Sequence, residues 1–405
     1  MFSIGNCEKS ERIVARPKFL IMADWYLPGY KSGGPVRTIA SVVERFGDQF
    51  DLRVITRDRD CGDTEPYQDV RSDCWTRVGK AQVWYASRVS LATIRTLVRD
   101  VDPQVIYLNS FFSILSRRIL LLRMCRLMPV AKIVMAPRGE LSPAALKIKW
   151  LRKRLYLLLC NSTSLLSGIL WQASSELERQ QIGEVSGVMA EIHVASDLKV
   201  EHIPEFTVPG RHKCVGHACF VFLSRISRIK NLEQVLRLLA GISGTVELDI
   251  YGPLEDRKYW RGCERAIGKM PTSVRVRYCG SVPHDQSAVT ISQYHFFVLP
   301  TLGENFGHAI LEALIAGCPV LISDRTPWTG LVEKKAGWDL PVDALEQWHS
   351  VLQRCVDMGQ SDYDELSAGA QRVARAFLSG AGRSEETNAL FDKALRCESH
   401  AGAIG

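Results

Sequence analysis

Short apolar runs alternate along the chain with longer stretches in which apolar residues recur every three or four positions. The run at 18–27 predicts a first strand, and the stretch at 34–46 predicts a helix with Val36, Ile39 and Val43 on one face. This alternation is typical of βαβ units, in which helices cover a parallel sheet. Further strands of this first series are predicted at 51–57, 81–87, 104–110 and 131–137.

A second series of the same kind begins after residue 217. Its helices are predicted at 231–242 and 304–317. The two series indicate an α/β protein with two Rossmann-like, doubly wound domains that face a ligand-binding cleft. The strands of the second series are predicted at 219–227, 246–252, 274–282, 295–300 and 318–324.

A stretch with little periodicity separates the two series. It contains Pro204, Pro209 and Gly210, which favour irregular backbone. The chain is therefore divided into an N-terminal domain at 1–200, a linker at 201–217, a C-terminal domain at 218–380, and a C-terminal helix and tail at 381–405 that could return to the N-terminal domain.

Composition and charge narrow the possible partners. Apolar residues make up 46% and charged residues 23%, which excludes a disordered, collagen-like or coiled-coil chain. The net charge of +7 is uneven, because residues 1–200 contain 29 Lys and Arg against 20 Asp and Glu, while the remainder contains 22 against 24. Such asymmetry points to a polyanion or an anionic membrane surface. No nucleic-acid-binding motif accompanies the charge, so a nucleic acid is not expected.

The cysteines and the apolar runs of the chain indicate in which compartment the protein is found. The 12 cysteines are scattered, without a CxxC pair or a Cys/His spacing typical of zinc. The first residues lack the apolar core of a signal peptide, and many free thiols favour a reducing cytoplasm. The longest apolar runs are about six residues, against the roughly 20 needed to span a bilayer. We expect a cytoplasmic protein that does not cross a membrane.

The stretch from Leu299 to Trp328 carries the most informative pattern. A predicted strand ends at Pro300 and the chain turns through Gly303, which places Glu304 at the edge where open parallel sheets bind ligands. The backbone N–H groups of 305–308 begin the next helix and suit anions or hydroxyl oxygens. Glu312 lies two turns into that helix among apolar neighbours, where a carboxylate needs a partner. From spacing alone, a solvated Glu on a mixed helix is the alternative.

A basic loop follows the first strand of the second series. Arg225 and Lys230 flank this loop before the next helix. Arg offers a planar fork and Lys a point charge, a pairing expected around a diphosphate. Arg228 could compete for this role, and a basic loop in solvent is the alternative.

In this context the sequence resembles the retaining glycosyltransferases of family 4, which have the two-domain GT-B fold. The resemblance rests on ENFGHAILEALIAGCPVLISD at 304–324 and on Trp328, Gly337 and Trp338, which are similar to members from bacterial polysaccharide assembly. It extends over about Asp24 to Pro341.

This resemblance implies roles for the residues above. Glu304 would contact hydroxyls of the donor sugar, and Glu312 would accept hydrogen bonds from the ribose hydroxyls, as a carboxylate can. Arg225 and Lys230 would neutralise the leaving nucleoside diphosphate. The backbone of the residues after Glu304 would assist it, namely Asn305, Phe306 and Gly307.

Two sets of glycines complete the predicted donor site. Gly33 and Gly34 lie between a predicted strand and helix, where the missing side chain lets backbone approach a ligand. The resemblance implies that they face the donor phosphate and the acceptor. Gly252 and Gly280 end strands on the same edge as Glu304, and the resemblance implies that they line the nucleobase; plain turns are the alternative.

The first domain supplies the predicted acceptor contacts. Arg138 and Glu140 follow a strand end in a Pro-Arg-Gly segment similar to one that faces the acceptor in such transferases. Asn109 ends another strand, at a place where several relatives have a histidine.

Basic and apolar residues interleave at 146–155. A basic, aromatic-containing helix of this kind is typical of an element on a membrane surface. A core-packed helix with a solvated basic face is the alternative. The basic residues of this segment are Lys147, Lys149, Arg152, Lys153 and Arg154.

The sequence thus predicts a retaining glycosyltransferase that moves a sugar from a nucleoside diphosphate sugar to a glycan or a polyprenyl diphosphate-linked acceptor, in cell-surface polysaccharide biosynthesis. Fixed positive charge and positioning would accelerate the reaction. No metal or cofactor is expected, because no Asp-x-Asp pair is predicted to lie at a strand end. We expect a cytoplasmic enzyme, peripheral on the cytoplasmic face of the inner membrane. A GT-B nucleotide-sugar 2-epimerase and a non-catalytic, membrane-associated scaffold with the same fold are the alternatives.

Overall fold

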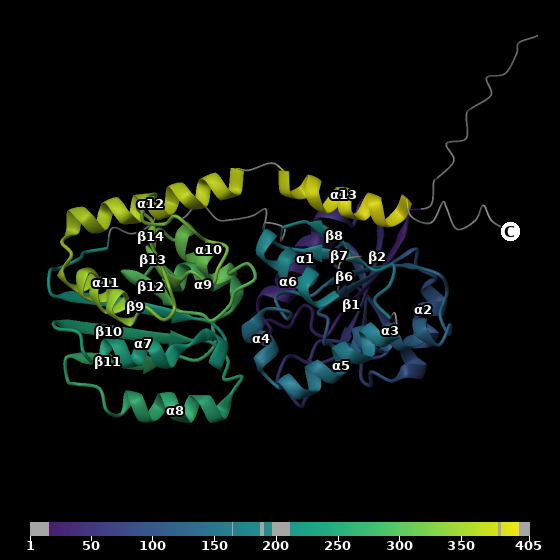
Figure 1. Ribbon diagram of the computed structural model, residues 1–405, viewed down its shortest axis with the longest axis horizontal. Helices are drawn as coiled ribbons and strands as arrows, with labels where there is room; N and C mark the ends of the chain where they lie inside the picture. The colour runs from purple at the N-terminus through teal and green to yellow at the C-terminus, as the bar shows by residue number, and fades with distance from the viewer. Residues whose placement is uncertain (1–15, 164, 187–189, 197–210, 380–381, 397–405) are drawn as a thin grey trace, which may run out of the picture.

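Two α/β domains lie side by side in the computed structural model, which describes residues 16–163, 165–186, 190–196, 211–379 and 382–396 (Figure 1). Each domain is built on one twisted sheet with helices on both faces, so the α/β class and the two Rossmann-like domains are confirmed. The predicted linker lies outside the described residues as far as residue 210.

The first domain contains an eight-stranded sheet in the order β3-β4-β2-β1-β5-β6-β7-β8. All neighbours pair in parallel except β3 and β4, which are antiparallel. The strands are β1 (Lys18–Ala23), β2 (Asp51–Arg57), β3 (Trp75–Val78), β4 (Ala81–Ala86), β5 (Val105–Asn109), β6 (Lys132–Ala136), β7 (Leu170–Ala173) and β8 (Glu191–Val194). The helices are α1 (Gly34–Phe46), α2 (Leu91–Val101), α3 (Ile114–Met124), α4 (Pro143–Lys147), α5 (Trp150–Ser162) and α6 (Glu176–Ser186).

Alternate residues of the central strand β1 enter two different cores. Phe19 and Ile21 pack in the cluster that contains α1, whereas Leu20 and Met22 pack in the cluster that contains α2 and α3. Successive side chains of a strand point to opposite faces, so a strand covered on both sides is apolar throughout. This explains why β1 appears in the sequence as a continuous apolar run.

The second domain contains a six-stranded sheet, parallel throughout, in the order β11-β10-β9-β12-β13-β14. Its strands are β9 (His217–Leu223), β10 (Thr245–Tyr251), β11 (Val274–Tyr278), β12 (Phe296–Leu299), β13 (Val320–Ser323) and β14 (Gly337–Leu340). Its helices are the 3₁₀ helix η1 (Arg228–Lys230), α7 (Leu232–Leu239), α8 (Arg257–Ile267), α9 (His284–Ile291), α10 (His308–Ile315), α11 (Leu345–Asp357) and α12 (Gln360–Ser379).

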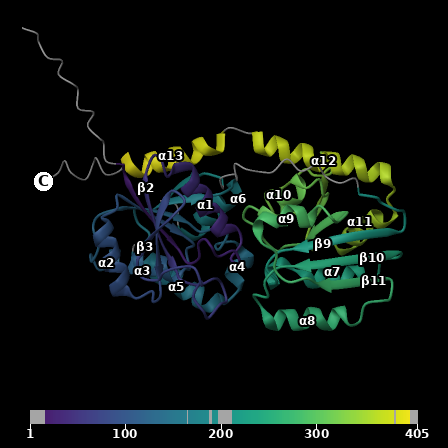
Figure 2. The same cartoon turned by 180° about the vertical axis from the view of Figure 1, so that it is seen from behind.

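The last described helix, α13 (Gly382–Arg396), packs on the first domain. Helices α12 and α13 follow one another along the same side of the molecule, α12 over the second domain and α13 over the first (Figure 2). The Phe391 ring lies 5.0 Å from that of Phe19 and 5.2 Å from that of Phe46, measured between ring centroids. The final helix is therefore part of the core of the first domain.

The basic segment at 146–155 is not one continuous helix. Helix α4 ends at Lys147, and Lys149 has a left-handed backbone (φ 54°) before α5 begins at Trp150. The periodicity of the segment did not reveal this break, because basic and apolar residues continue through it. Strands β3, β7, β8 and β14, each four residues long, were also not predicted.

We expect Phe391→Ala to destabilise the first domain by about 3–5 kcal/mol, because the substitution leaves a cavity among several aromatic rings. Chemical denaturation followed by tryptophan fluorescence measures this change. Lys393→Ala on the same helix is the matched control: its exposed ion pair with Glu191 should be worth less than about 1 kcal/mol. Equal effects of the two substitutions would show that α13 is not part of this core.

Candidate functional site

A cavity lies between the carboxyl ends of the two sheets. The loop between β1 and α1 lines it from the first domain, together with Arg138 after β6. The second domain contributes the segments that follow β9, β10 and β12. Most predicted donor residues therefore come together here, and those that line the cavity are Gly33, Gly34, Arg225, Lys230, Gly252, Glu304, Asn305, Phe306 and Gly307.

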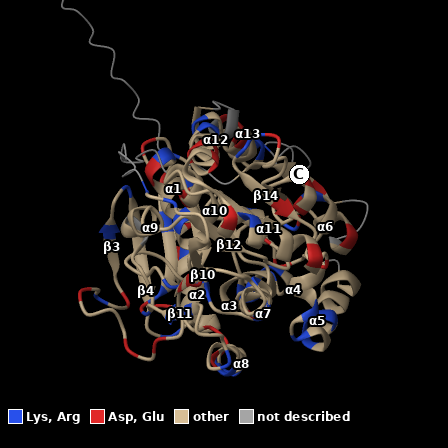
Figure 3. Ribbon diagram, turned by 90° about the vertical axis from the view of Figure 1, so that its left-hand side faces the viewer, with Lys and Arg blue, Asp and Glu red and all other residues tan. Residues whose placement is uncertain are grey.

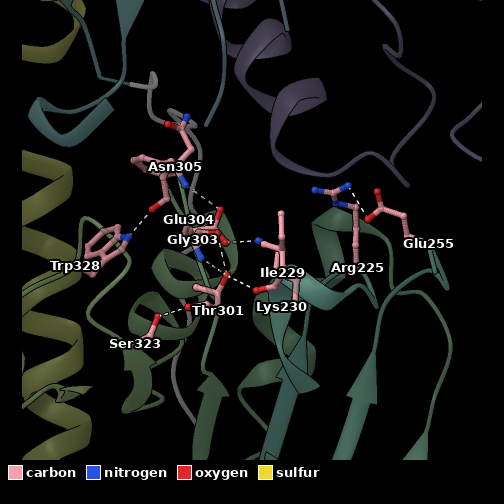
Figure 4. Close-up of polar contacts among 11 residues, drawn as sticks. Arg225, Ile229, Lys230, Glu255, Thr301, Gly303, Glu304, Asn305, Ser323 and Trp328 are labelled. Atoms are coloured by element: carbon pink, nitrogen blue, oxygen red, sulfur yellow. Dashed lines mark hydrogen bonds and ion pairs between the residues drawn. The ribbon is translucent and has the colours of Figure 1, made fainter. Parts of the chain in front are cut away.

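The Lys230–Glu304 ion pair lies in this cavity (Figure 4). Lys230 Nζ donates to Glu304 Oε2 at 2.5 Å, and the two side chains are only 9% and 17% exposed. Lys230 ends the 3₁₀ helix that follows β9, and Glu304 follows β12, the neighbouring strand of the same sheet. Parallel strands bring their carboxyl ends to one edge, so two segments 74 residues apart in the chain meet there.

Two opposing effects set the protonation state of Glu304. Burial by itself would raise the pKa of its carboxyl group, but the Lys230 ammonium and, more weakly, Arg225 and the Asn305 N–H hold the pKa below its usual value. Glu304 is therefore an ionised hydrogen-bond acceptor at neutral pH.

Hydrogen bonds from three side chains fix the loop that carries Glu304, and the sequence did not reveal these bonds. Thr301 Oγ1 donates to Ile229 O at 3.1 Å, which ties this loop to the one that carries Lys230. Ser323 Oγ donates to Thr301 O at 2.5 Å, and Trp328 Nε1 donates to Phe306 O at 2.6 Å. These side chains fix the backbone on both sides of Glu304 (Figure 4).

Arg225 lines the cavity without joining the Lys230–Glu304 pair. Its Nη1 donates to Glu255 Oε2 at 2.8 Å, and both side chains are more than a third exposed. An incoming diphosphate could compete for this guanidinium, because an exposed ion pair is weak. Arg228, the alternative candidate, does not line the cavity; it pairs with Asp256 at 3.3 Å and is 61% exposed.

Two of the predicted glycines lie where a side chain would meet a neighbouring group: a side chain at Gly34 and backbone at Gly252. A Cβ on Gly34 would lie 2.9 Å from the His308 ring of the opposite domain. A Cβ on Gly252 would lie 1.9 Å from Ser224 O, and its φ of 138° is one that side chains rarely adopt. Gly280 does not line the cavity, but its carbonyl oxygen accepts the Gly252 N–H at 2.8 Å.

Glu312 lies behind the cavity wall, on α10, where it forms an ion pair with Arg37 of α1. The pair joins the two domains, and its side chains are 9% and 15% exposed. Asn305 makes a second interdomain contact, since Ser174 Oγ donates to its Oδ1 at 2.6 Å. The segment from Glu304 to Glu312 therefore contacts the first domain at several points.

Of the predicted acceptor residues, only Arg138 lines the cavity. Arg138 Nε donates to Asn109 Oδ1 at 2.9 Å, and Arg138 also bonds to the Tyr107 hydroxyl. Both carboxylate oxygens of Glu140 accept hydrogen bonds, one from Ser110 Oγ and one from the Phe112 N–H. Asn109 and Glu140 therefore position the loops around Arg138 and do not line the cavity themselves.

The expectation that no Asp-x-Asp pair lies at a strand end was wrong. Asp58 and Asp60 form an Asp-x-Asp pair directly after β2, although no such pair was recognised at a strand end. Asp60 Oδ2 accepts the N–H groups of Tyr30 and Lys31 at 2.8 and 3.1 Å. Asp58 accepts hydrogen bonds from Arg59 and Ser72. Asp60 thus holds the loop that carries Gly33, whereas Asp58 bonds to its own loop and to Ser72.

A group of potential metal ligands lies at the opposite edge of the second sheet. His217, Cys219 and His295 approach one another there. Nδ1 of His295 accepts the Cys219 N–H at 3.0 Å, and Nε2 lies 3.2 Å from His212 O. Both ring nitrogens are therefore already engaged, and within the described chain this group is separate from the cavity.

Helix α5 presents an apolar face to solvent. Leu151, Leu155, Leu158 and Leu159 recur at helical spacing and are each 54–60% exposed. Four of the five basic residues are exposed beside this face, but Lys153 turns inward and donates to Ala145 O at 2.7 Å. Figure 3 shows the Lys and Arg positions of α5 at the edge of the molecule. Among the described helices, none is both long and apolar enough to span a membrane.

The second domain matches a known family. Residues 213–355 match the family described as glycosyl transferases group 1. The matched segment includes Arg225, Lys230, Glu304 and Glu312. No curated protein matches the chain significantly by sequence.

The whole chain is similar in fold to solved structures of low sequence identity. Sucrose-phosphate synthase from Thermosynechococcus elongatus is 15% identical, with a TM-score of 0.70 over 94% of this chain and 100% of that one. HepE of Anabaena, solved with UDP-glucose, is 15% identical, with a TM-score of 0.65 over 93% and 99%. WaaG, a glycosyltransferase involved in lipopolysaccharide biosynthesis, is 13% identical, with a TM-score of 0.65 over 92% and 98%. The chain therefore has the GT-B fold.

The lowered pKa of Glu304 predicts a pH dependence of stability. Glu304→Gln removes the partner of a buried ammonium and should cost about 3 kcal/mol near pH 7. Because the pKa of the carboxyl group is lower in the folded than in the unfolded chain, this stabilisation is present above the usual value of 4.5 and is lost as the pH falls through the folded value. Unfolding free energies of both proteins from pH 8 down to about pH 2 measure the difference.

Glu255→Gln is the matched control, since it removes the exposed partner of Arg225 and should cost less than about 1 kcal/mol throughout this range. A difference between wild type and Glu304→Gln that stayed constant below pH 4.5 would contradict the ionised pair.

Proposed function

We propose that this glycosyltransferase is a retaining enzyme of family 4, which transfers a sugar from a nucleoside diphosphate sugar to a glycan or lipid-linked saccharide in cell-surface polysaccharide biosynthesis. The observation that carries the proposal is the buried Lys230–Glu304 pair, with Arg225 beside it, in a cavity between the domains. All three side chains belong to the domain that matches the glycosyl transferases group 1 family.

The charges of the cavity favour a diphosphate donor. Arg225 and Lys230 supply positive charge at the sheet edge where such ligands bind. Glu304 would accept hydrogen bonds from the hydroxyls of the donor sugar, with backbone support from 305–307. The structure of HepE with UDP-glucose supports a donor of this class.

In the proposed reaction, the bond between the anomeric carbon and the diphosphate oxygen breaks while the acceptor oxygen attacks the same face. The acceptor proton passes to the departing phosphate, and the product is a nucleoside diphosphate. Negative charge grows on that phosphate, so the fixed cations Arg225 and Lys230 stabilise the transition state more than the ground state. Because these two side chains supply the charge, we propose that no metal or cofactor takes part, and an excess of EDTA should leave the rate unchanged.

The acceptor would enter from the first domain, past Arg138. Asn109 holds this guanidinium, and Glu140 holds the loop next to it, so both would act on the acceptor indirectly. The fold shared with WaaG, which is involved in lipopolysaccharide biosynthesis, supports a saccharide acceptor.

We expect Glu304→Ala and Lys230→Ala to lower turnover at least about 100-fold with folding intact, because each removes one half of the pair that positions and stabilises the reacting groups. Nucleotide release from UDP-, GDP- and ADP-sugars is measured with a polyprenyl diphosphate-linked sugar as acceptor. Arg228→Ala, in the same loop but outside the cavity, is the control and should be close to wild type.

The same assay separates the alternatives. Near-normal turnover in either variant would contradict the roles proposed for Glu304 and Lys230. Interconversion of sugar nucleotides without acceptor would indicate an epimerase, and sugar-nucleotide binding without turnover would indicate a scaffold.

We further propose that α5 binds the anionic cytoplasmic face of the inner membrane and thereby keeps a cytoplasmic enzyme near a lipid-linked acceptor. Its exposed leucines form one face, and exposed Lys147, Lys149, Arg152 and Arg154 lie beside it. A surface that combines apolar side chains with basic ones fits the interface of an anionic bilayer. Each basic residue near such a surface contributes about 1 kcal/mol.

Leu155→Ser with Leu158→Ser should abolish flotation with vesicles that contain anionic lipid, because the double substitution removes the centre of the apolar face. Leu345→Ser, an exposed leucine of the second domain, should float like wild type. Wild-type binding should weaken at high salt. If wild type binds the vesicles at neither low nor high salt, the basic residues are only a solvated face of the protein.

A further inference from the structure

Three side chains of the kinds that bind zinc meet on one face of the second sheet. His217 and Cys219 are two positions apart on β9, so their side chains point to the same face of the sheet. Glu247 lies on the neighbouring strand β10, directly opposite Cys219 in the register of this parallel pair. Strand pairing therefore brings an imidazole, a thiol and a carboxylate together, although Glu247 and Cys219 are 28 positions apart in the sequence.

The distances between the three ligand atoms fit a tetrahedral metal ion. His217 Nε2 lies 3.5 Å from Glu247 Oε1 and 3.7 Å from Cys219 Sγ. Cys219 Sγ lies 4.0 Å from Glu247 Oε1. Zinc binds nitrogen and oxygen at about 2.0–2.2 Å and sulfur at about 2.3 Å, so two of its ligand atoms at a tetrahedral angle are about 3.3–3.6 Å apart. Small rotations of the side chains are enough to reach these values.

The other polar groups of the cluster support this arrangement. Nδ1 of His295 accepts the Cys219 N–H at 3.0 Å, and Nε2 contacts a backbone carbonyl oxygen at 3.2 Å, so His295 holds the backbone of β9 and is not one of the ligands. The second oxygen of Glu247, Oε2, lies 3.7 Å from Arg275 Nη1. This ion pair directs Oε1 toward His217 and Cys219.

Charge and exposure also favour a divalent cation. When the Cys219 thiol releases its proton to solvent, a thiolate and a carboxylate balance the two positive charges of the ion, and the imidazole binds as a neutral ligand. The side chains of His217 and Glu247 are 33% and 31% exposed, so an ion can enter from solvent and a water molecule can take the fourth position. Sulfur and imidazole ligands select zinc over magnesium and calcium.

We propose that His217, Cys219 and Glu247 form a zinc site that joins β9 to β10 and stabilises the second domain. The site lies at the opposite edge of the sheet from the cavity, so the ion takes no part in sugar transfer. The inference is therefore independent of the proposed function. Removal of zinc by EDTA should lower the stability of the second domain and leave the rate of the folded enzyme unchanged.

The first measurement is zinc binding to the full chain. The protein is stripped with EDTA, desalted and titrated with Zn²⁺ in competition with a chromophoric chelator, and bound metal is counted by atomic absorption. We expect about one zinc ion per chain. Zinc at about 100 times its Kd should raise the melting temperature by about 5 °C or more, because an ion that binds only the folded state stabilises that state.

Cobalt reports the identity of the ligands. Tetrahedral Co²⁺ bound to a thiolate has a sulfur-to-metal charge-transfer band in the near ultraviolet, which a site made of oxygen and nitrogen ligands lacks. We expect this band when Co²⁺ is added to the stripped wild-type protein. Cys219→Ser should abolish it.

Two conservative variants test the ligands. Cys219→Ser and Glu247→Gln nearly preserve the shape of each side chain and should weaken zinc binding at least about tenfold, because even groups that only support a ligand contribute about 10- to 100-fold. Circular dichroism of the metal-free variants confirms that they fold. Cys125→Ser, which changes an exposed thiol of the first domain, is the matched control and should keep the zinc affinity and the cobalt band of wild type.

Two results would overturn the inference. If wild type binds no zinc, the cluster is only a His–Glu ion pair beside a half-buried thiol. If zinc binds and either Cys219→Ser or Glu247→Gln retains the wild-type affinity, the ion is held by other residues of the chain.

Discussion

The rest of the site depends on one constraint. Two largely buried carboxylates lie at the junction between the two sheets, and each of them needs an ion pair. Glu304 and Glu312 are borne on one short segment, and both are largely removed from water. A buried carboxylate remains ionised only if a cation or several hydrogen-bond donors compensate for the lost hydration. Lys230 meets this need for Glu304 within the second domain, and Arg37 of the first domain meets it for Glu312.

The surrounding backbone is shaped so that these pairs can form. Gly34 and Gly252 remove side chains where loops approach each other within contact distance. Thr301 and Trp328 fix the loop between β12 and α10 through hydrogen bonds to backbone carbonyl groups. These hydrogen bonds hold the groups that face the cavity in place, which lowers the entropic cost of orienting them during a reaction.

The sequence was sufficient for the class of fold and for most residues of the cavity, because apolar periodicity and strand-end motifs are local signals. Glu304 and Lys230 could be found in this way, since each directly follows a predicted strand or short loop. The pairing of Glu312 with Arg37 could not be found, because it depends on how two domains pack. Asp58 and Asp60 directly follow a predicted strand, but their role could not be found from the sequence. The hydrogen bonds from the Tyr30 and Lys31 N–H groups to Asp60 show that Asp60 supports a loop. The broken helix at Lys149 likewise depends on a single backbone conformation.

The return of α13 to the first domain has a consequence for how such proteins can diversify. Phe391 fills a space among aromatic residues near the start of the chain, so the first domain consists of two segments separated by the whole second domain. A recombination event that exchanged only the first half of the chain would pack the aromatic residues of one protein against the final helix of another. The first domain can therefore be exchanged intact only when both segments are inherited together; otherwise it can change only by loop substitutions within an existing pair of segments.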